Sequence, residues 1–351
     1  MNKTHYLICL AILLLSSCKP SNDTKKTETN YKEQAIEKGP ITLVIHGGAG
    51  NINREALGPE RDSLYRAKLK EALEVGYDKL SRGGSAMDAV VATIQTMEAS
   101  PLFNAGVGAV FTNEGKNELD ASVMNGKDKM AGAVAGVTTI KSPIAAAKAV
   151  MDKSPHVMMA RDGAEQFAKE IGLEMVDPSY FYTERRFKSL ERVREAERKK
   201  ELSYLEKYPD WKYGTVGCVA LDKDGNIAAG TSTGGMTNKK YGRIGDSPVI
   251  AAGTYADNAT CGVSATGHGE FFIRNVVAYD IAAKMKYLNL NLDEAADKVI
   301  NEELVEFGGD GGIIALDRAG NISMPFNTSG MFRGYKNTAD DTRVFIYNDE
   351  E

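Results

Sequence analysis

The sequence predicts a mixed fold of helices and strands in which hairpins build layered sheets, and three observations support this. The 35 glycines and 10 prolines among 351 residues predict many tight turns and argue against a helical bundle. Several segments carry apolar residues at helical spacing. Two distant segments, 220–227 and 315–322, share the form Ala-Leu-Asp-x-x-Gly-Asn-Ile, which is typical of a hairpin.

The overall composition is that of a soluble protein with material for one large domain or two small ones. Hydrophobic residues make up 42% of the chain, charged residues make up 26%, and the formal net charge is −5. A mildly acidic chain has no electrostatic attraction for a phosphate backbone, so we expect no nucleic acid among its partners.

The first residues of the chain have the features of a leader. Residues 6–15 form an apolar run after Lys3 that is too short to span a bilayer and is typical of a signal-peptide core. The run ends in Leu15-Ser16-Ser17-Cys18, which resembles the bacterial lipobox. We therefore expect residues 1–17 to be a lipoprotein signal peptide, with a lipid on Cys18 that tethers the mature protein. The alternative is a plain secretory signal with an incidental cysteine.

The leader also predicts a location. We expect an extracytoplasmic bacterial lipoprotein, periplasmic and anchored to a membrane, with residues 18–38 as a disordered polar spacer. In such an oxidising compartment Cys218 and Cys261 could form a disulfide. Both lie in apolar, strand-like runs, so two buried free thiols are an equally good interpretation.

The body of the chain begins with a short buried strand at 41–45, followed by His-Gly-Gly-Ala-Gly at 46–50, which we expect to be a glycine-rich loop. Ser85 has the residue type and position of a helix N-cap. Apolar spacing predicts helices at 61–81, 85–97, 143–153 and 162–171, and apolar runs between polar turns predict strands at 102–112, 121–124 and 132–139.

Residues 183–208 are a highly charged part of the chain. Acidic and basic residues are interleaved there with few apolar anchors, which favours a solvated helix or linker over a nucleic-acid site. Beyond this tract we expect hairpin strands at 216–222 and 227–232, a second hairpin within 311–331, and helices at 270–288 and 292–305.

The first hairpin has a register that can be worked out from its turn. Gly225 suits the left-handed position of a three-residue loop made of residues 223–225, so Asp222 pairs with Asn226. The same register places Thr215 opposite Thr233, with Cβ atoms about 4.5–5.5 Å apart on one face. Threonine pairs also occur in sheets for purely structural reasons, and a β-bulge would break the register.

Thr215 would gain a function if the chain were cut in front of it. An internal threonine is a poor nucleophile, whereas an N-terminal threonine carries an α-amino group with a pKa of about 7.7–8.0, which is suitable for a general base. Gly214 leaves the backbone free to adopt the strained conformation that self-cleavage needs. The charged tract would then become the loose end of the first fragment.

Seven motifs in order carry a resemblance to a known family. The protein resembles the isoaspartyl peptidase/L-asparaginases, the plant-type asparaginases of the N-terminal nucleophile hydrolases. The resemblance implies an α+β fold, a four-layer αββα sandwich, made from a precursor that cuts itself. The matching motifs lie at 46–50, 100–112, 118–126, 214–217, 231–239, 242–248 and 265–270.

The resemblance also implies a division of the chain. Residues 39–214 would form an α subunit that ends in the charged linker 183–214, and residues 215–351 would form a β subunit. The two subunits would build one catalytic domain, and two such αβ units would form a homodimer.

Carried over to this sequence, the resemblance gives roles to individual residues. Thr215 resembles the nucleophile, and Thr233 resembles the residue that orients its hydroxyl. Thr266 and Gly267 resemble an oxyanion hole. Arg243 and Asp246 resemble a clamp for the α-carboxylate and α-ammonium groups of an aspartyl substrate, and an arginine can bind such a carboxylate bidentately. Further substrate contacts are implied for Ile244, Gly245, Thr266, Gly267, His268 and Gly269, and a supporting role is implied for Asn104.

The resemblance implies no cofactor for catalysis, but it implies a structural sodium ion. Backbone carbonyls would hold this ion, so side chains give little information about it, and a glycine-rich turn without metal is the alternative. His46 and His268 lie in glycine-rich segments without metal-ligand spacing, and we assign them no catalytic role. The implied sodium ligands are the carbonyls of Met97, Glu98, Ser100, Phe103, Ala105 and Val107.

The expected activity is hydrolysis of β-aspartyl dipeptides and of L-asparagine through an aspartyl ester on Thr215. A glycosylasparaginase-like amidase is the nearest alternative, but that group has aspartate where this chain has Gly214. A lipid-anchored protein that only binds amino acids is an alternative from another class, and it predicts an intact chain. The sequence does not rank the possible substrates.

Overall fold

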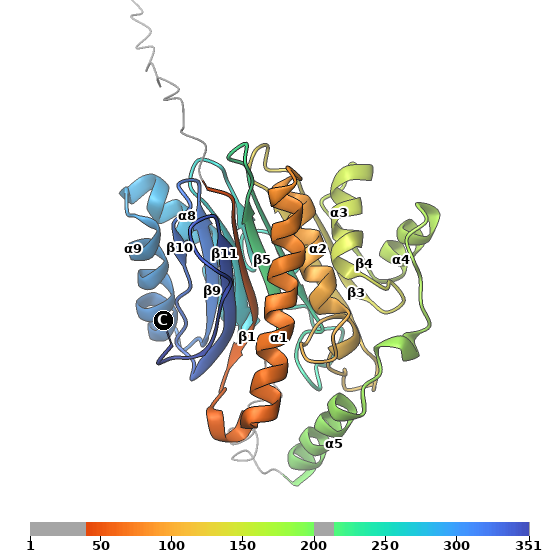
Figure 1. The fold of residues 1–351 in the computed structure, drawn as a ribbon. Coiled ribbons are helices and arrows are strands. Elements are labelled where there is room, and N and C mark those ends of the chain that lie inside the picture. The colour runs from red at the N-terminus through yellow and green to blue at the C-terminus, as the bar shows by residue number, and fades with distance from the viewer. Residues whose placement is uncertain (1–39, 200–213, 351) are drawn as a thin grey trace, which may run out of the picture. The chain divides into compact units, whose positions relative to one another are not determined.

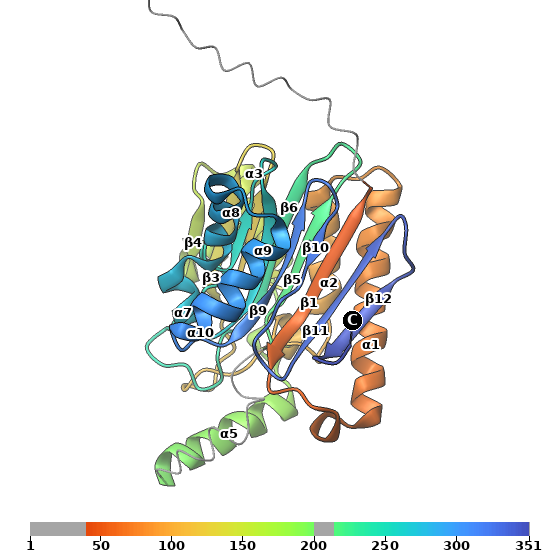
Figure 2. The ribbon, with the colours of Figure 1, turned by 90° about the vertical axis from the view of Figure 1, so that its left-hand side faces the viewer.

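Two stacked β-sheets form the centre of the structure, and helices cover the outer face of each sheet (Figure 1, Figure 2). The structure is a computed structural model that describes residues 40–199 and 214–350. The resulting four layers confirm the αββα sandwich. Helices α1 (Arg54–Ser81), α2 (Ala86–Glu98) and α3 (Pro143–Lys153) pack on the larger sheet, and α8 (Val277–Leu288) and α9 (Leu292–Asp297) pack on the smaller one.

The larger sheet has eight strands, which come from both halves of the chain. They are β1 (Thr42–Gly50), β2 (Leu119–Asn125), β3 (Ala131–Val137), β4 (Met158–Ala160), β5 (Val216–Leu221), β6 (Ile227–Thr233), β11 (Gly330–Asn337) and β12 (Arg343–Tyr347). Their order in the sheet is β12-β11-β1-β5-β6-β2-β3-β4. Neighbours run antiparallel, except for the parallel pair β3 and β4.

The smaller sheet has four strands, and its order is β10-β9-β8-β7. These strands are β7 (Thr254–Ala256), β8 (Cys261–Gly267), β9 (Gly311–Asp317) and β10 (Ile322–Ser323). The two hairpins that the sequence repeats therefore lie in different layers, because β5 and β6 belong to the larger sheet while β9 and β10 belong to the smaller one.

The other helices of the described residues are short or lie at the edges of the layers. They are α4 (Arg161–Glu170), α5 (Glu184–Lys199), α7 (Gly269–Asn275), a π-helix at Lys298–Glu303, α10 (Leu304–Glu306), and 3₁₀ turns at Gly106–Gly108 and Pro178–Phe181.

Alternation along the central strands separates two apolar cores. On β1, Leu43 and Ile45 face the core under α1 to α3, whereas Val44 faces the core between the sheets. On β5, Cys218 belongs to the first core and Val219 belongs to the second. Odd-numbered residues of β5 therefore face the second sheet, and the same alternation directs the side chain of Thr215 into the space between the sheets.

The first half of the chain departs from the sequence prediction in two places. Residues 46–50 are not a loop, because they continue β1 through a β-bulge between His46 and Gly48. Residues 102–112 are not a strand, because they fold into tight turns around the 3₁₀ turn Gly106–Gly108. The predicted helix at 143–153 agrees with α3, and Ser85 caps α2 as expected.

The second half departs from the prediction in its helices. The expected helix at 270–288 is broken into α7 and α8 at Val276, which has a left-handed φ of 50°. The described part of the charged tract is the helix α5, as one of the two interpretations expected, but this helix is not solvated on all sides. It packs through the buried side chains of Leu190, Val193 and Arg186.

The structure also bears on the cysteines and the leader. Cys218 and Cys261 are buried free thiols, and the two apolar cores hold one each. Within residues 40–199 and 214–350, we find no helix with the length and apolarity needed to cross a bilayer. The predicted signal peptide, lipidation at Cys18 and polar spacer at 18–38 lie outside the described residues.

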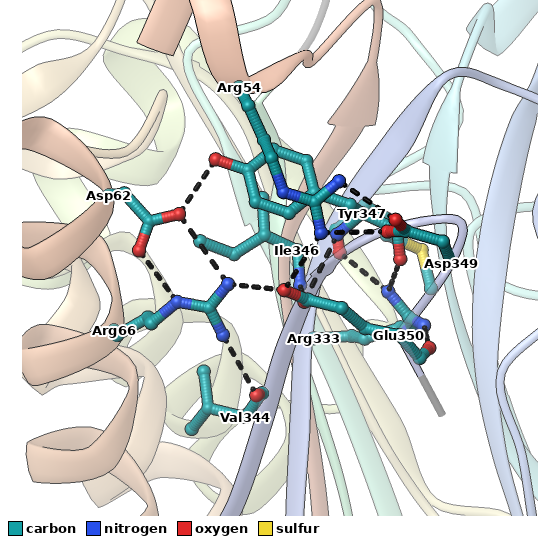
Figure 3. A network of polar contacts seen from close by, with 10 residues as sticks. Arg54, Asp62, Arg66, Arg333, Val344, Ile346, Tyr347, Asp349 and Glu350 are labelled. Atoms are coloured by element: carbon teal, nitrogen blue, oxygen red, sulfur yellow. Dashed lines mark hydrogen bonds and ion pairs between the residues drawn. The ribbon is translucent and has the colours of Figure 1, made fainter. Parts of the chain in front are cut away.

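A polar network fastens the end of β12 to helix α1 (Figure 3). Arg54 makes two hydrogen bonds to the Asp349 carboxylate, at 2.8 and 2.9 Å. Arg66 binds the Glu350 carboxylate at 2.6 Å, and the Tyr347 hydroxyl donates to Asp62 at 2.7 Å. The C-terminal segment is therefore held by side chains from near the start of the described chain.

Candidate active site

Thr215 and Thr233 meet at the open end of the β5–β6 hairpin, as the sequence register predicts. The pairs run from Leu221 opposite Ile227 to Val216 opposite Ser232. One step beyond, the Thr215 hydroxyl donates to Thr233 Oγ1 over 3.1 Å. Gly235 N–H also donates to Thr233 Oγ1, over 3.0 Å, so two donors fix the orientation of this hydroxyl. Both threonines are buried.

Gly214 precedes the nucleophile candidate in a conformation that admits no side chain. Its φ is +148°, and a Cβ there would lie only 2.8 Å from the Cβ of Asn104. On its other side, a Cβ on Gly48 would lie 2.5 Å from the Gly214 Cα. The Gly214 carbonyl accepts a hydrogen bond from Asn104 N–H over 2.9 Å. This carbonyl therefore already faces a donor that can stabilise negative charge.

Asn104 connects this junction to the end of β6. Its side chain donates to the Gly235 carbonyl over 2.7 Å and accepts from Val110 N–H over 2.9 Å. Its own carbonyl accepts from Gly234 N–H over 3.0 Å. The turn-rich segment 102–112 thus aligns Asn104 with both Gly214 and the residues that follow Thr233.

Thr266 and Gly267 end strand β8 of the smaller sheet, opposite the threonine pair. The Thr266 hydroxyl oxygen accepts from Ala49 N–H over 3.3 Å, which leaves its own proton to be donated elsewhere. Gly267 lines one pocket together with Thr215, Thr233, Gly235, Met236, Arg243, Gly245, Asp246, Ser247, His268 and Gly269. Thr266 and Ile244, which sequence reasoning also assigned to the site, are not among the lining residues.

The two predicted clamp residues stand side by side, but Arg243 already has a partner. Its Nε and Nη2 atoms each donate to the carboxylate of Glu270 over 2.9 Å. His268 and Arg243 hold the pKa of the Glu270 carboxyl well below its usual range. A side chain at Gly269 would meet both Asp246 Oδ1 and Arg243 Nη2 within 2.8 Å, so only glycine leaves the clamp open.

Asp246 is a buried acid with spare hydrogen-bonding capacity. Among the described residues, its Oδ2 atom has no hydrogen-bond partner. Burial raises the pKa of this carboxyl to about 7, although the attraction of Arg243 works in the opposite direction. An acid in this state favours a cationic group beside it, because such a group would restore the ionised form.

Comparison with known proteins identifies the family of the chain. A family model described as "Asparaginase" matches residues 39–346. The chain belongs to the asparaginase family. It is 48% identical over 317 residues to the "Isoaspartyl peptidase" of Escherichia coli (strain K12), which covers 89% of this chain and 98% of that protein.

Eukaryotic members of the asparaginase family are similar over nearly the same length. The "Putative isoaspartyl peptidase/L-asparaginase" of Dictyostelium discoideum is 46% identical and covers 84% of this chain and 92% of that protein. The "Isoaspartyl peptidase/L-asparaginase" of Bos taurus is 40% identical and covers 83% of this chain and 91% of that protein.

The loop predicted to hold sodium in this asparaginase-family chain turns back on itself. The Glu98 carbonyl stands 2.2 Å from the place where a Cβ of Gly106 would lie, and the Phe103 carbonyl stands 2.0 Å from the equivalent place on Gly108. Both carbonyls therefore pack against the loop's own backbone, and the structural sodium ion stays a prediction. The described residues contain no cluster of three or more histidine, cysteine, aspartate or glutamate side chains that could hold a metal ion.

Sequence reasoning missed three contacts of the site. It did not pair Glu270 with Arg243, although the two residues are only 27 positions apart in the sequence. It left α5 as a loose end, whereas Arg185 Nη2 donates to the carbonyls of Pro101 and Leu102, both over 3.0 Å. It also gave His46 no role, whereas His46 Nδ1 lies 3.0 Å from the Thr215 carbonyl oxygen. None of these pairings follows from local spacing.

Proposed function

We propose that this chain is an isoaspartyl peptidase/L-asparaginase that cuts itself between Gly214 and Thr215. It then hydrolyses β-aspartyl dipeptides and L-asparagine through an ester between the aspartyl group and Thr215. Relatives that bear these names match most of the chain. The observation that carries the proposal is the Thr215–Thr233 hydrogen bond directly after Gly214, where only glycine fits.

The self-cleavage step needs only groups of the chain and water. The Thr215 hydroxyl attacks the Gly214 carbonyl carbon while Asn104 N–H stabilises the oxygen that becomes negative. The C–N bond breaks, and the Thr215 nitrogen takes up the proton that the hydroxyl loses. Water then hydrolyses the new ester, which leaves a carboxylate on Gly214 and a free α-amino group on Thr215.

Substrate hydrolysis would use that new amino group as the base. It takes the proton of the Thr215 hydroxyl, whose orientation Thr233 holds, and the oxygen attacks the side-chain amide carbon of the substrate. The Thr266 hydroxyl and Gly267 N–H would stabilise the developing oxyanion, and one such donor is typically worth about 2.7–4 kcal/mol. The ammonium of Thr215 protonates the leaving amine, and water releases aspartate from the ester.

The pocket suits a substrate with a free α-carboxylate and a free α-ammonium group. Glu270 engages Arg243 through Nε and Nη2, so Nη1 and the second Nη2 hydrogen remain for the substrate carboxylate. The substrate carboxylate would therefore contact the Nη1 and Nη2 atoms. Without Glu270, the arginine could offer its Nε and Nη2 atoms to the substrate instead. The Oδ2 atom of Asp246, which has no partner within the described part of the chain, would accept from the ammonium. A zwitterionic aspartyl group satisfies both clamp residues at once.

A denaturing gel tests the proposal directly. The purified protein should give two fragments, and the smaller should begin Thr-Val-Gly-Cys. Thr215→Ala should remain a single chain without activity, whereas a Thr215→Ala protein that still matures would take the role away from Thr215. Parallel assays with β-aspartyl-leucine, L-asparagine and a glycosylated asparagine then rank the substrates.

The two alternative functions make different predictions in the same experiments. A glycosylasparaginase would prefer the glycosylated asparagine, but that group has aspartate at the position before its threonine, where this chain has no space for a side chain. A protein that only binds amino acids would remain one chain and hydrolyse none of the three compounds.

The proposal extends to the setting of the enzyme. Its leader and Cys18 support a periplasmic lipoprotein that is tethered to a membrane. The family resemblance supports a homodimer of αβ units, which light scattering of the cut protein would measure. It also supports a sodium ion held by carbonyls of the loop 97–107, and stability measured with sodium or with choline as the only cation would test this ion.

A further inference from the structure

The carbonyl of Thr215 lies where the sheet ladder ends. Asp222 N–H bonds to the Asn226 carbonyl of the neighbouring strand, so the backbone N–H and C=O groups of even-numbered residues in β5 point toward β6, and those of odd-numbered residues point toward β1. On the β1 side the pairing stops at His46 opposite Gly217. Thr215 is the next odd residue, and the bulge of β1 after His46 carries the backbone away from it.

The side chain of His46 supplies the missing partner. Its Nδ1 atom lies 3.0 Å from the Thr215 carbonyl oxygen, and its Nε2 atom lies 3.0 Å from the Ser264 hydroxyl. Gly217 makes this arrangement possible, because a Cβ there would lie 2.1 Å from His46 Nε2 and 2.0 Å from Ser264 Oγ. The second glycine of the Gly-Thr-Val-Gly motif therefore leaves room for the imidazole.

The partners of His46 determine its tautomer. A carbonyl oxygen can only accept, so Nδ1 carries the proton, and Nε2 of the neutral ring then accepts from the Ser264 hydroxyl. The Ser264 hydroxyl also lies 2.7 Å from the Thr231 hydroxyl. Thr254 donates to Thr231 over 2.6 Å, and the Ser122 hydroxyl lies 2.8 Å from Thr254. A buried chain of hydroxyl groups between the two sheets thus holds the imidazole in one orientation.

We propose that His46 is a positioning residue that fixes the main chain of Thr215 in the mature enzyme. The inference rests on the proposed function and deepens it. In the precursor, Thr215 is also held by its bond to Gly214, whose carbonyl binds Asn104 N–H. After the cut this bond is gone, and Val216 is the one residue to which Thr215 stays covalently joined. The hydrogen bond from His46 Nδ1–H to the Thr215 carbonyl then fixes the main chain that carries the α-amino group, while Thr233 orients the hydroxyl.

Three variants of His46 test this role. Asparagine carries an N–H donor the same number of bonds from Cα as Nδ1, whereas the amide of glutamine corresponds to Nε2. In His46→Ala and His46→Gln we expect kcat on β-aspartyl-leucine to fall about ten- to 100-fold, the effect of an unpaired buried carbonyl. In His46→Asn we expect kcat to recover to within about threefold of the parent protein, with KM little changed in all three variants.

The same variants separate positioning from simple packing. If the ring only filled space, glutamine, which is closer in volume, would replace it better than asparagine, and that result would overturn the proposal. Self-cleavage followed on gels should stay close to the parent rate, and a loss of cleavage in step with kcat would also overturn it. If His46→Ala does not fold, the comparison of asparagine with glutamine still decides. A parent protein that neither cuts itself nor hydrolyses β-aspartyl-leucine would refute the proposed function instead.

Discussion

Replacing Asp246 by asparagine should stabilise the fold above neutral pH and weaken substrate binding at the same time. The Asp246 carboxyl is buried, and burial raises its pKa to about 7. In an unfolded chain an aspartate has a pKa of about 3.9, so between about pH 4 and pH 7 the folded protein retains a proton that the unfolded chain loses. Stability therefore falls as the pH rises through this window. Above it, the carboxylate costs about 4 kcal/mol of unfolding free energy, at about 1.4 kcal/mol per pKa unit.

A neutral amide at position 246 removes this cost, with a partial offset. The amide nitrogen would take the place of Oδ2, which has no partner among the described residues. Its N–H groups would then be buried without acceptors, which lowers the unfolding free energy by about 1–3 kcal/mol. The net gain at pH 8 is then about 1–3 kcal/mol, and it should decrease by about 3 kcal/mol between pH 8 and pH 5. Substrate binding should weaken at least about 100-fold, because the buried ammonium would lose its counter-charge.

Urea denaturation on an uncut background measures this effect. Thr215→Ala should keep the chain in one piece, so Thr215→Ala is compared with Thr215→Ala/Asp246→Asn at pH 5 and pH 8. The matched control is Thr215→Ala/Asp341→Asn, which also removes one negative charge but at an exposed residue. If Thr215→Ala and Thr215→Ala/Asp246→Asn differ in stability by the same amount at both pH values, the argument that burial raises the pKa of Asp246 is refuted. Substrate affinity is measured separately on mature Asp246→Asn protein.

Two further predictions concern the clamp and the anchor. Arg243→Lys should raise KM about tenfold or more and leave self-cleavage unchanged, because lysine cannot make the paired contact to Glu270 and the substrate together; a slower cut, followed on gels, would contradict the clamp role. The mature protein made in a bacterial host should partition into detergent through the lipid on Cys18, and Cys18→Ser should not; equal partitioning of the two proteins would exclude lipidation as the anchor.

The threonine pair could be predicted from the sequence because a short turn determines it. The loop of residues 223–225 and the left-handed Gly225 fix the register, with a φ of +75° at that glycine. No bulge intervenes before Val216, so the register extends to Thr215 and Thr233. The residues of one turn are therefore enough to predict that the Thr215 and Thr233 hydroxyls lie together.

The contacts that sequence reasoning missed depend on the packing of distant segments. His46 and Ser264 are 218 residues apart, and they meet only because two sheets stack face to face. Residues 102–112 have the composition of a strand, but their backbone groups bond to Gly214, Lys116 and Asn238 and not to a neighbouring strand. Tertiary partners of this kind override local propensity, and a single sequence carries no record of them.

The order of strands explains how the proposed cut can leave the site intact. Strands β1 to β4 precede Gly214, and β5, β6, β11 and β12 follow it, yet β1 lies between β11 and β5, and β2 lies beside β6. Each of these contacts is an antiparallel ladder, and the network between α1 and the end of β12 adds ion pairs across the same division (Figure 3). Separating the fragments would expose both cores, so cleavage frees one amino group while the strands that position it remain paired.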